Sequence, residues 1–386
     1  MYYAWSLGGW VPLLNKLRKQ YGNVFTAWFG PIPYVSIADF DTAHEVFVKH
    51  GSNYADRPVS PLFNEARRGY GIVSANGPLW QEIRRFSLVT FRNMGMGRDK
   101  MEPKIMEELD ARCASVDKNL VNGVSVIPVS EFFDLTVGSI INSILMGKRF
   151  DDDNKDDFLH LKHLLDKGTT LMTPLDMILP VWMIKMFSKK RYDAILRSHF
   201  DIMDFLAKDA VVRYEDVIAG KITIDAENPS DYVDSFILKM QQEGSDKNAY
   251  LIAEIQRHAS ILNVSFWKVS HETAEVGGFL IDSGALITAQ LSAFHSNETA
   301  FENPNLFDPE RFIRNKELAQ KLIPFGIGKR ACTGESLARA ELYLIIGNLL
   351  LRYKFERHEK KTASIDIAPF SFAKKPELYE MKFIKF

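Results

Sequence analysis

The spacing of hydrophobic and polar positions predicts a β-containing start to this chain. Residues 13–21 have the spacing of a helix with a basic face. Two apolar runs, Val24–Phe29 and Tyr34–Ile37, flank a Gly-Pro segment and predict a hairpin. Asp39–His50 then predicts a helix capped by Asp39 or Asp41, because a side-chain carboxylate there can accept the first free backbone N–H groups.

The middle of the chain predicts long helices. Residues 80–242 carry a mostly helical pattern that breaks at 93–97, 151–154 and 220–229. The fold class expected is therefore mainly α with a small β portion.

The last third predicts a return of β structure. A second hairpin is expected over Val276–Gln290, with Asp282–Gly284 as its turn. The chain shows no repeat and no Gly-, Ser- or Pro-rich linker. We therefore expect one domain over residues 1–386, with β structure in about 1–60 and 264–300.

Composition excludes several classes of function. Of the 386 residues, 46% are hydrophobic, enough for a sizeable core, and the net charge of −1 gives no reason to expect nucleic acid as a partner. The two cysteines, Cys113 and Cys332, cannot form a disulfide framework, which fits a reducing compartment. They are also too few for a four-cysteine zinc site.

Two segments bear on membranes. Met1–Trp10 is short and glycine-broken, so it predicts neither an anchor nor a signal peptide, and no transmembrane helix is expected elsewhere. Leu171–Phe187 is apolar, broken by prolines, and followed by Ser188–Arg191 with three basic residues. It fits a pair of short buried segments and a peripheral membrane contact about equally well.

One loop, Pro324–Glu335, carries the clearest chemistry. It places Cys332 among glycines, after Lys329 and Arg330 and just before a helix whose apolar face is expected at Leu337, Ala340, Leu344, Gly347 and Leu351. Nearby cations and a helix N-terminus favour a thiolate, the form that binds metals. The same residues formally fit a dinucleotide fingerprint, but the proline before them argues against the buried strand which that fingerprint needs.

The loop pattern F-G-x-G-x-R-x-C-x-G resembles the haem-ligand loop of the cytochrome P-450 family. The resemblance implies that Cys332 is the iron ligand and that Arg330 contacts a haem propionate. Phe325 and Gly328 would belong to the same cofactor-binding loop.

Three other places extend the resemblance along the chain. Glu254 and Arg257, in Glu-x-x-Arg spacing, and Arg311, in Phe307–Phe312, resemble the Glu-Arg-Arg brace of the haem loop. Trp80 and Arg84 are spaced one helical turn apart, so an indole N–H and a guanidinium can both reach a propionate. Lys268 occupies the place where relatives carry a further propionate donor.

The resemblance is strongest to the microsomal, xenobiotic-metabolising branch, which Asn53–Pro58 also fits. It implies a haem-thiolate monooxygenase that inserts one atom of dioxygen into an apolar xenobiotic, fatty acid or steroid. The partners implied are a flavoprotein reductase that passes on electrons from NADPH, and cytochrome b5. The expected location is the cytoplasmic face of the endoplasmic reticulum, or the cytoplasm because no anchor is found.

The chain also departs from the family pattern. The family's long distal helix, with small residues followed by an acid and a threonine, should lie between Gln242 and Glu254, but only residues 243–253 are there. No catalytic acid–threonine pair is therefore assigned. The alternative to an active monooxygenase is a truncated haem-binding or non-functional splice form, or an incorrectly assembled gene model. An enzyme that uses Cys332 as a nucleophile is a distant third.

Overall fold

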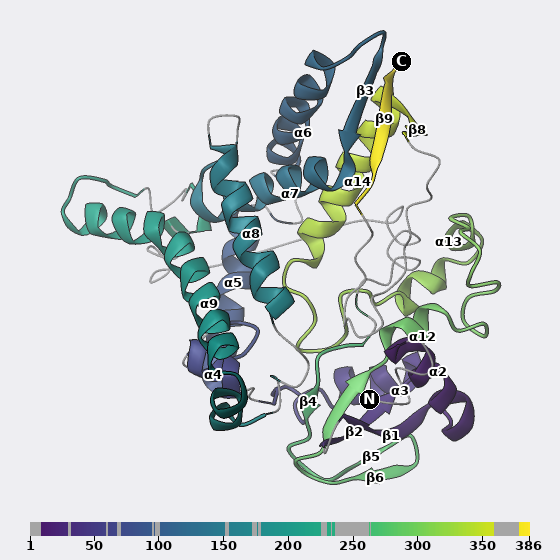
Figure 1. The fold of residues 1–386 in the computed structure, drawn as a ribbon. Helices are drawn as coiled ribbons and strands as arrows, with labels where there is room; N and C mark the ends of the chain where they lie inside the picture. Colours follow the sequence, from purple (N-terminus) through teal and green to yellow (C-terminus); the bar gives the residue numbers. More distant parts are fainter. Residues whose placement is uncertain are drawn as a thin grey trace. The chain divides into compact units, whose positions relative to one another are not determined.

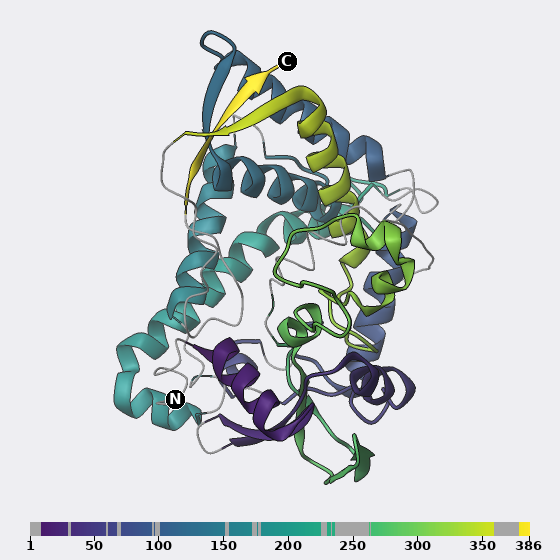
Figure 2. The ribbon, with the colours of Figure 1, turned by 90° about the vertical axis from the view of Figure 1, so that its right-hand side faces the viewer.

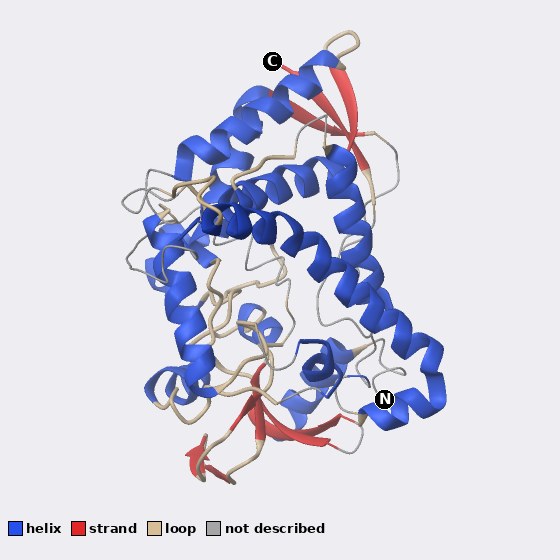
Figure 3. Ribbon diagram, turned by 90° about the vertical axis from the view of Figure 1, so that its left-hand side faces the viewer, coloured by secondary structure: helices blue, strands red, loops and turns tan. Residues whose placement is uncertain are grey.

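The computed structural model describes most of the chain. The described residues are 9–29, 32–58, 61–67, 71–94, 96, 101–150, 154–171, 176, 179–224, 230–232, 234–235, 262, 264–358 and 378–386. Helices dominate and strands are few (Figure 3), so the expected fold class is confirmed. The expected hairpin over residues 24–37 is also confirmed.

Contacts divide the chain into two compact units, each built from separated segments. Unit 1 comprises Met1–Pro58, Ala249–Glu335 and Thr362–Glu377, and unit 2 comprises Val59–Asn248, Ser336–Lys361 and Leu378–Phe386. Each unit is described below by itself. The single domain expected from the sequence stays a prediction.

Unit 1 is built on a four-stranded sheet in the order β1-β2-β7-β4. Strand β2 pairs antiparallel with β1 and parallel with β7, so residues 34–37 lie against residues 286–289. The elements of unit 1 are α2 (Trp10–Tyr21), β1 (Val24–Phe29), β2 (Ile32–Ile37), α3 (Phe40–His44), a π-helical turn (Glu45–Lys49), β4 (Lys268–Val269), β5 (Ala274–Val276), β6 (Phe279–Ile281), β7 (Leu286–Ala289), α12 (Leu291–His295), α13 (Arg311–Arg314) and a 3₁₀ segment (Lys316–Lys321).

The second hairpin lies elsewhere than the sequence predicted. The chain turns at Gly277–Gly278, between β5 and β6, and both glycines have positive φ. A two-residue turn of this kind favours glycine, and its twist matches paired strands. The predicted turn at Asp282–Gly284 was wrong as a hairpin, because β7 pairs with β2 and β4 and not with β6.

The core of unit 1 joins the sheet to the chain around the π-helical turn. Asp39 caps α3, as expected, by accepting a hydrogen bond from the backbone N–H of Thr42 at 2.8 Å. The cluster of apolar side chains includes Ile37, Phe47, Ile287 and Ile323. The apolar faces of the turn and the sheet thus pack beside residues that lead into the cysteine loop.

Unit 2 is mostly helical and has one small sheet in the order β3-β9-β8. Its long helices α8 and α9 pack side by side (Figure 1). The elements of unit 2 are α4 (Pro61–Arg67), α5 (Gly77–Asn93), α6 (Met101–Lys118), β3 (Val124–Pro128), α7 (Val129–Met146), α8 (Lys155–Leu171), α9 (Val181–Ile218), α14, β8 (Tyr353–Arg357) and β9 (Glu380–Lys385).

Helix α14 (Glu335–Arg352) begins three residues after Cys332, as expected. It runs beside α6 and leads directly into β8 (Figure 2), and the Asn348 amide donates to the sulfur of Met106 at 3.4 Å. The predicted apolar face was partly wrong. Glu341 is buried together with Leu337, Ile345 and Leu349, whereas Leu351 is 79% exposed.

Helix α7 is the one described helix that is long and apolar enough to cross a membrane, judged by length and composition alone. Phe132, Ile140 and Ile144 of this helix belong to the core of unit 2. Core helices of soluble proteins pass the same test, so α7 is weak evidence for a span.

Candidate functional site

The cysteine loop of unit 1 is held by its own backbone. Gly326 and Gly328 have φ of 78° and 80°, a left-handed conformation that glycine adopts at low cost. The N–H of Ala331 donates to the carbonyl of Gly328 at 2.9 Å, and the N–H of Cys332 donates to the carbonyl of Phe325 at 2.9 Å. The loop therefore closes on itself just before the cysteine, and the half-buried Phe325 supplies the closing carbonyl.

Gly328 also brings the loop into close contact with the π-helical turn. A Cβ at this position would lie 1.9 Å from the backbone carbonyl oxygen of Phe47, far inside any van der Waals contact. A side chain there would have to move one of two backbones. Glycine at position 328 therefore fixes the cysteine loop against Phe47.

The two cysteines of the chain differ in their surroundings. Cys332 is exposed at the end of the loop, whereas Cys113 of α6 is buried, and burial raises the pKa of its thiol. A thiol whose pKa is raised is a poor ligand and a poor nucleophile. Cys332 is thus the cysteine that can reach a ligand.

Three cations gather in unit 1. Arg330 is almost fully buried, and its Nε donates to the carbonyl of Ala55 at 2.5 Å. Lys268 of β4 is also buried, with its amine 4.1 Å from the centre of the Phe47 ring. The guanidinium of Arg57 lies 4.8 Å from the centre of the Phe266 ring. Arg57, Lys268 and Arg330 are called the cation cluster below.

The surroundings of Lys268 in the cation cluster change its pKa. Burial, together with the charges of Arg57 and Arg330, lowers the pKa of this lysine from 10.5 to about 7. Both causes act in the same direction, because an apolar environment and like charges each disfavour the protonated amine. A group that brings negative charge would relieve this strain.

One carboxylate, Asp56, joins the cation cluster from its edge. It lies 3.9 Å from the guanidinium of Arg330 and 3.5 Å from Nε2 of His271. The backbone carbonyl of Asp56 accepts from the N–H of Val269 at 3.0 Å, which ties this segment to β4. Asp56 is partly exposed, so it offsets the cation cluster only in part.

Trp80 and Arg84 lie in unit 2, on one face of α5. Trp80 is buried, and the guanidinium of Arg84 lies 5.8 Å from the centre of the indole ring. The predicted spacing of one helical turn is thus realised, with an indole and a guanidinium as neighbours.

Arg311 of α13 is buried and points its guanidinium at backbone carbonyls. It donates to Glu302 at 2.5 Å, to Leu306 at 3.0 Å and to Asn303 at 3.3 Å. Glu254 and Arg257, its expected partners in the brace, lie outside the described residues. The brace therefore stays a prediction.

The structure adds Arg57 and Asp56 to the residues found from the sequence. Their segment, Asn53–Pro58, stood out in the sequence, but nothing local connected it with Arg330 or Lys268. The signal was an arginine and an acid before a proline, which alone is too common to carry a role.

The donor set fits a haem and not a protein-only metal site. No group of three or more histidine, cysteine or acidic residues that could hold a metal occurs within the described part of the chain. One exposed thiol can supply a single iron ligand, and the excess positive charge suits a cofactor that carries carboxylates. Gly326 has nothing within 4 Å of where its Cβ would be, so this part of the loop leaves open space.

Comparisons with known proteins decide the family. The family model for cytochrome P-450 matches residues 10–250 and 249–383. This chain belongs to the cytochrome P-450 family. Members are haem-thiolate monooxygenases, and haem is the cofactor of the family.

The relatives span almost the whole chain. A probable cytochrome P-450, cyp-35D1 of Caenorhabditis elegans, is 38% identical, with 100% of this chain and 91% of the relative covered. Cytochrome P-450 2C23 of Rattus norvegicus is 27% identical over 89% of this chain and 82% of the relative. Cytochrome P-450 2C3 of Oryctolagus cuniculus is 26% identical over 96% and 89%.

The nematode relative contains residues that this chain lacks. The alignment spans 458 positions although the chain has 386 residues, so it includes residues of the relative that have no counterpart here. The family model is matched in two segments that meet at residues 249–250.

Proposed function

We propose that this chain holds haem iron through the Cys332 thiolate and inserts one atom of dioxygen into an apolar organic substrate, of xenobiotic, fatty acid or steroid type. The observation that carries the proposal is the exposed Cys332, which lies at the end of a loop fixed against Phe47 and two residues after a buried arginine. Bound haem would supply the oxygen chemistry, for which a thiolate ligand favours O–O cleavage.

The residues of the chain have separate tasks in this proposal. Cys332 binds the iron, and Gly328 keeps the loop at the distance that the ligand needs. Arg330 and Lys268, joined by Arg57, neutralise the haem propionates, because guanidinium and ammonium groups make strong hydrogen bonds to carboxylates. Phe325 packs beside the loop.

Trp80 and Arg84 are proposed as further propionate donors, as the family resemblance implies. Trp80 offers an indole N–H and Arg84 a guanidinium from one face of α5. Arg311, with Glu254 and Arg257, would brace the cysteine loop without touching reactants. The burial of Arg311 among three carbonyls supports a structural part for it.

The electron donors in this proposal are a flavoprotein reductase, supplied by NADPH, and cytochrome b5. The location would be the cytoplasmic face of the endoplasmic reticulum. Support for a membrane contact comes from the start of α9, where Trp182, Met186 and Phe187 are 62%, 63% and 74% exposed beside Lys189 and Lys190. Aromatic side chains next to lysines suit an anionic bilayer surface.

The membrane contact can be tested on vesicles. We expect the chain to co-sediment with vesicles that contain anionic lipid and to lose most of this binding in the double variant Trp182→Ala, Phe187→Ala. Exchange of the exposed Trp28 in unit 1 for alanine is the control. Equal binding of all three proteins would exclude the contact at this segment.

A second candidate function is haem binding without substrate turnover. It is favoured by the alignment, which is longer than this chain, and by residues 243–253, which lack the small-residue, acid and threonine run. A stretch of this length cannot replace a helix that spans a domain, even when fully extended. Such a chain would keep the thiolate loop and lack the groups that deliver protons to dioxygen.

The first test is the reduced carbon-monoxide difference spectrum of the purified chain, expressed with added haem precursor. We expect the red-shifted Soret band of thiolate ligation, and its loss in Cys332→Ser. A band at the histidine-like position, or no haem, would overturn haem-thiolate binding. An enzyme that used Cys332 as a nucleophile would have no such spectrum to lose.

Turnover separates the two candidate functions. Reductase, NADPH and a panel of apolar substrates are added to protein that shows the thiolate band. Substrate oxidation above the rate of the Cys332→Ser control supports the monooxygenase, and its absence with an intact band supports haem binding alone. Sequencing of transcripts from the locus tests truncation: a normal-length transcript as the sole product would exclude a splice form.

A further inference from the structure

The amine of Lys268 is buried among neutral groups. It donates to the Ser265 hydroxyl at 3.2 Å and to the carbonyl of Phe266 at 3.5 Å, and it faces the ring of Phe47. No carboxylate is among its hydrogen-bond or ion-pair partners in the part of the chain that the structure describes. A buried ammonium without an anionic partner is costly, and deprotonation is the usual escape.

The charged groups around Lys268 reinforce this cost. Arg57 lies in the segment before α4, and Arg330 lies in the cysteine loop. Burial and the charges of these two arginines lower the pKa of Lys268 to about 7. Asp56 lies near Arg330 and His271. The exposed Lys329 of the same loop is turned to the Ser52 hydroxyl at 2.9 Å. Strand β7 places the apolar Ile287 opposite Lys268.

We propose that the cation cluster binds its carboxylate ligand together with a proton, and that Lys268 is the group that accepts the proton. This inference rests on the proposed function, in which the ligand is a haem propionate. The arginines cannot take this part, since a guanidinium stays charged throughout the accessible pH range. A carboxylate placed beside Lys268 favours the protonated amine.

The sign of the pH dependence follows from this linkage. Below about pH 7 the lysine is already protonated in the haem-free chain, so Lys268 takes up no proton on binding and adds no pH dependence to haem binding there. Above that pH the free chain has lost the proton, and binding must restore it. Relative to a variant that lacks this lysine, haem retention by wild type therefore weakens as pH rises above neutrality, by up to about tenfold per pH unit for one proton.

The test compares wild type with Lys268→Arg, Lys268→Met and the control Lys49→Met. Lys49 is an exposed lysine of the π-helical turn whose Phe47 faces Lys268. The rate of haem loss to excess apomyoglobin is measured from pH 6 to pH 9. At each pH the loss rates of wild type and Lys49→Met are divided by that of each Lys268 variant, so that the thiolate contribution cancels. We expect this ratio to rise tenfold or more across the alkaline range.

Proton uptake gives a second readout that does not depend on the loss rate. Haem is added to each haem-free protein at pH 8 in weak buffer with an indicator dye. Thiolate ligation releases a proton in every variant and cancels in the comparison. Wild type should take up almost one proton more than Lys268→Arg or Lys268→Met, whichever folds.

The outcomes separate the two proposals. If the thiolate band forms but wild type and Lys268 variants share one pH profile and one proton count, the inference is wrong and the proposed function stands. If the thiolate band never forms, the proposed function fails. A weakening of haem retention at alkaline pH in Lys268→Arg as large as that in wild type would equally overturn the assignment to Lys268.

Discussion

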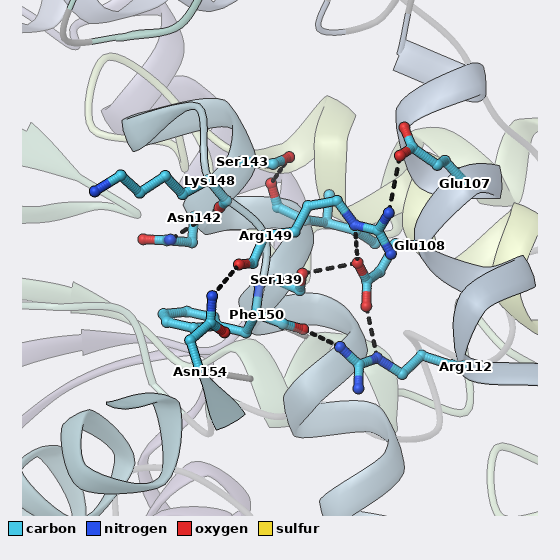
Figure 4. A network of polar contacts seen from close by, with 11 residues as sticks. Glu107, Glu108, Arg112, Ser139, Asn142, Ser143, Lys148, Arg149, Phe150 and Asn154 are labelled. Atoms are coloured by element: carbon cyan, nitrogen blue, oxygen red, sulfur yellow. Dashed lines mark hydrogen bonds and ion pairs between the residues drawn. The ribbon is translucent and has the colours of Figure 1, made fainter. Parts of the chain in front are cut away.

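Two groups of buried charges, one in each unit, are balanced differently. In unit 2, the carboxylate of Glu108 on α6 is 1% exposed and accepts from Nε of Arg112 at 2.6 Å, Nε of Arg149 at 2.8 Å and the hydroxyl of Ser139 at 2.7 Å (Figure 4). Arg112 also donates to the carbonyl of Phe150. These charges are neutralised by one another and by fixed dipoles.

The cation cluster in unit 1 has the opposite balance. Within the described part of the chain it joins three positive groups to Asp56, which is partly exposed and lies 3.9 Å from the guanidinium of Arg330. A buried group of charges that neutralise one another stabilises the local packing between helices. Burial of Lys268 beside like charges leaves electrostatic free energy that a negatively charged ligand can relieve, and on this ground we propose the cation cluster as a binding site.

The largest effect is expected where the balance in unit 2 is broken. Glu108→Gln leaves the guanidinium groups of Arg112 and Arg149, which are 11% and 31% exposed, without their shared buried anion, and we expect a loss of about 3–5 kcal/mol in the free energy of unfolding. Urea unfolding followed by circular dichroism measures it. The control is Glu107→Gln. Glu107 is 64% exposed and forms an ion pair with Arg149, so we expect this variant to lose less than about 1 kcal/mol in the free energy of unfolding. Equal losses in the free energy of unfolding of the two variants would show that Glu108 stabilises the fold no more than the exposed Glu107 does.

Removal of a charge from the cation cluster should raise the free energy of unfolding, whereas removal of the Glu108 charge should lower it. In the haem-free folded chain the pKa of Lys268 falls from 10.5 to about 7, so the unfolded chain binds a proton that the folded chain excludes. Stability therefore decreases as pH falls from 10.5 to 7, at up to about 1.4 kcal/mol per unit. Lys268→Met should gain about 2–3 kcal/mol over wild type between pH 9 and pH 7.

Urea unfolding of the haem-free proteins at both pH values measures this gain. Lys49→Met should show no such gain. A gap between Lys268→Met and wild type that does not change with pH would mean that Lys268 is not strained in the folded chain.

The contact of the cysteine loop with Phe47 comes next. In Gly328→Ala the added methyl meets a backbone carbonyl, and overpacking of this kind costs about 1–3 kcal/mol. Gly326→Ala shares the positive φ but has open space, so it isolates the cost of conformation alone. Haem content per chain should fall in Gly328→Ala more than in Gly326→Ala, and the reverse order would contradict the role of this contact.

The smallest effect concerns Glu341 of α14, a buried carboxyl with an oxygen that finds no hydrogen-bond partner among the described residues. Burial raises its pKa from 4.5 to about 8, so the folded chain keeps a proton that the unfolded chain loses. Stability falls as pH rises from 4.5 to 8, and Glu341→Gln removes this term, worth about 1.4 kcal/mol between pH 6 and pH 7. The exposed Glu82→Gln should not change the slope in a urea titration.

Features that lie within one short stretch of this protein could be predicted from its amino-acid order. The cysteine loop with its glycines, the basic residues before Cys332 and the Trp80–Arg84 spacing each lie within a short stretch, where residue order fixes which groups are neighbours. Helix periods and the hairpin over residues 24–37 could be read for the same reason. They depend on side-chain spacing along one element.

Contacts between segments that are distant in the chain became known from the folded structure. Pairing of β2 with β7 brings residues 34–37 beside 286–289, and with them Arg57, Lys268 and Arg330 come from three separate stretches into one cluster. Likewise, Glu341 is a charged residue, a type that is expected to face the solvent, and yet it is buried. The physical reason is that burial and long-range electrostatics depend on which surfaces pack, and local periodicity does not contain that information.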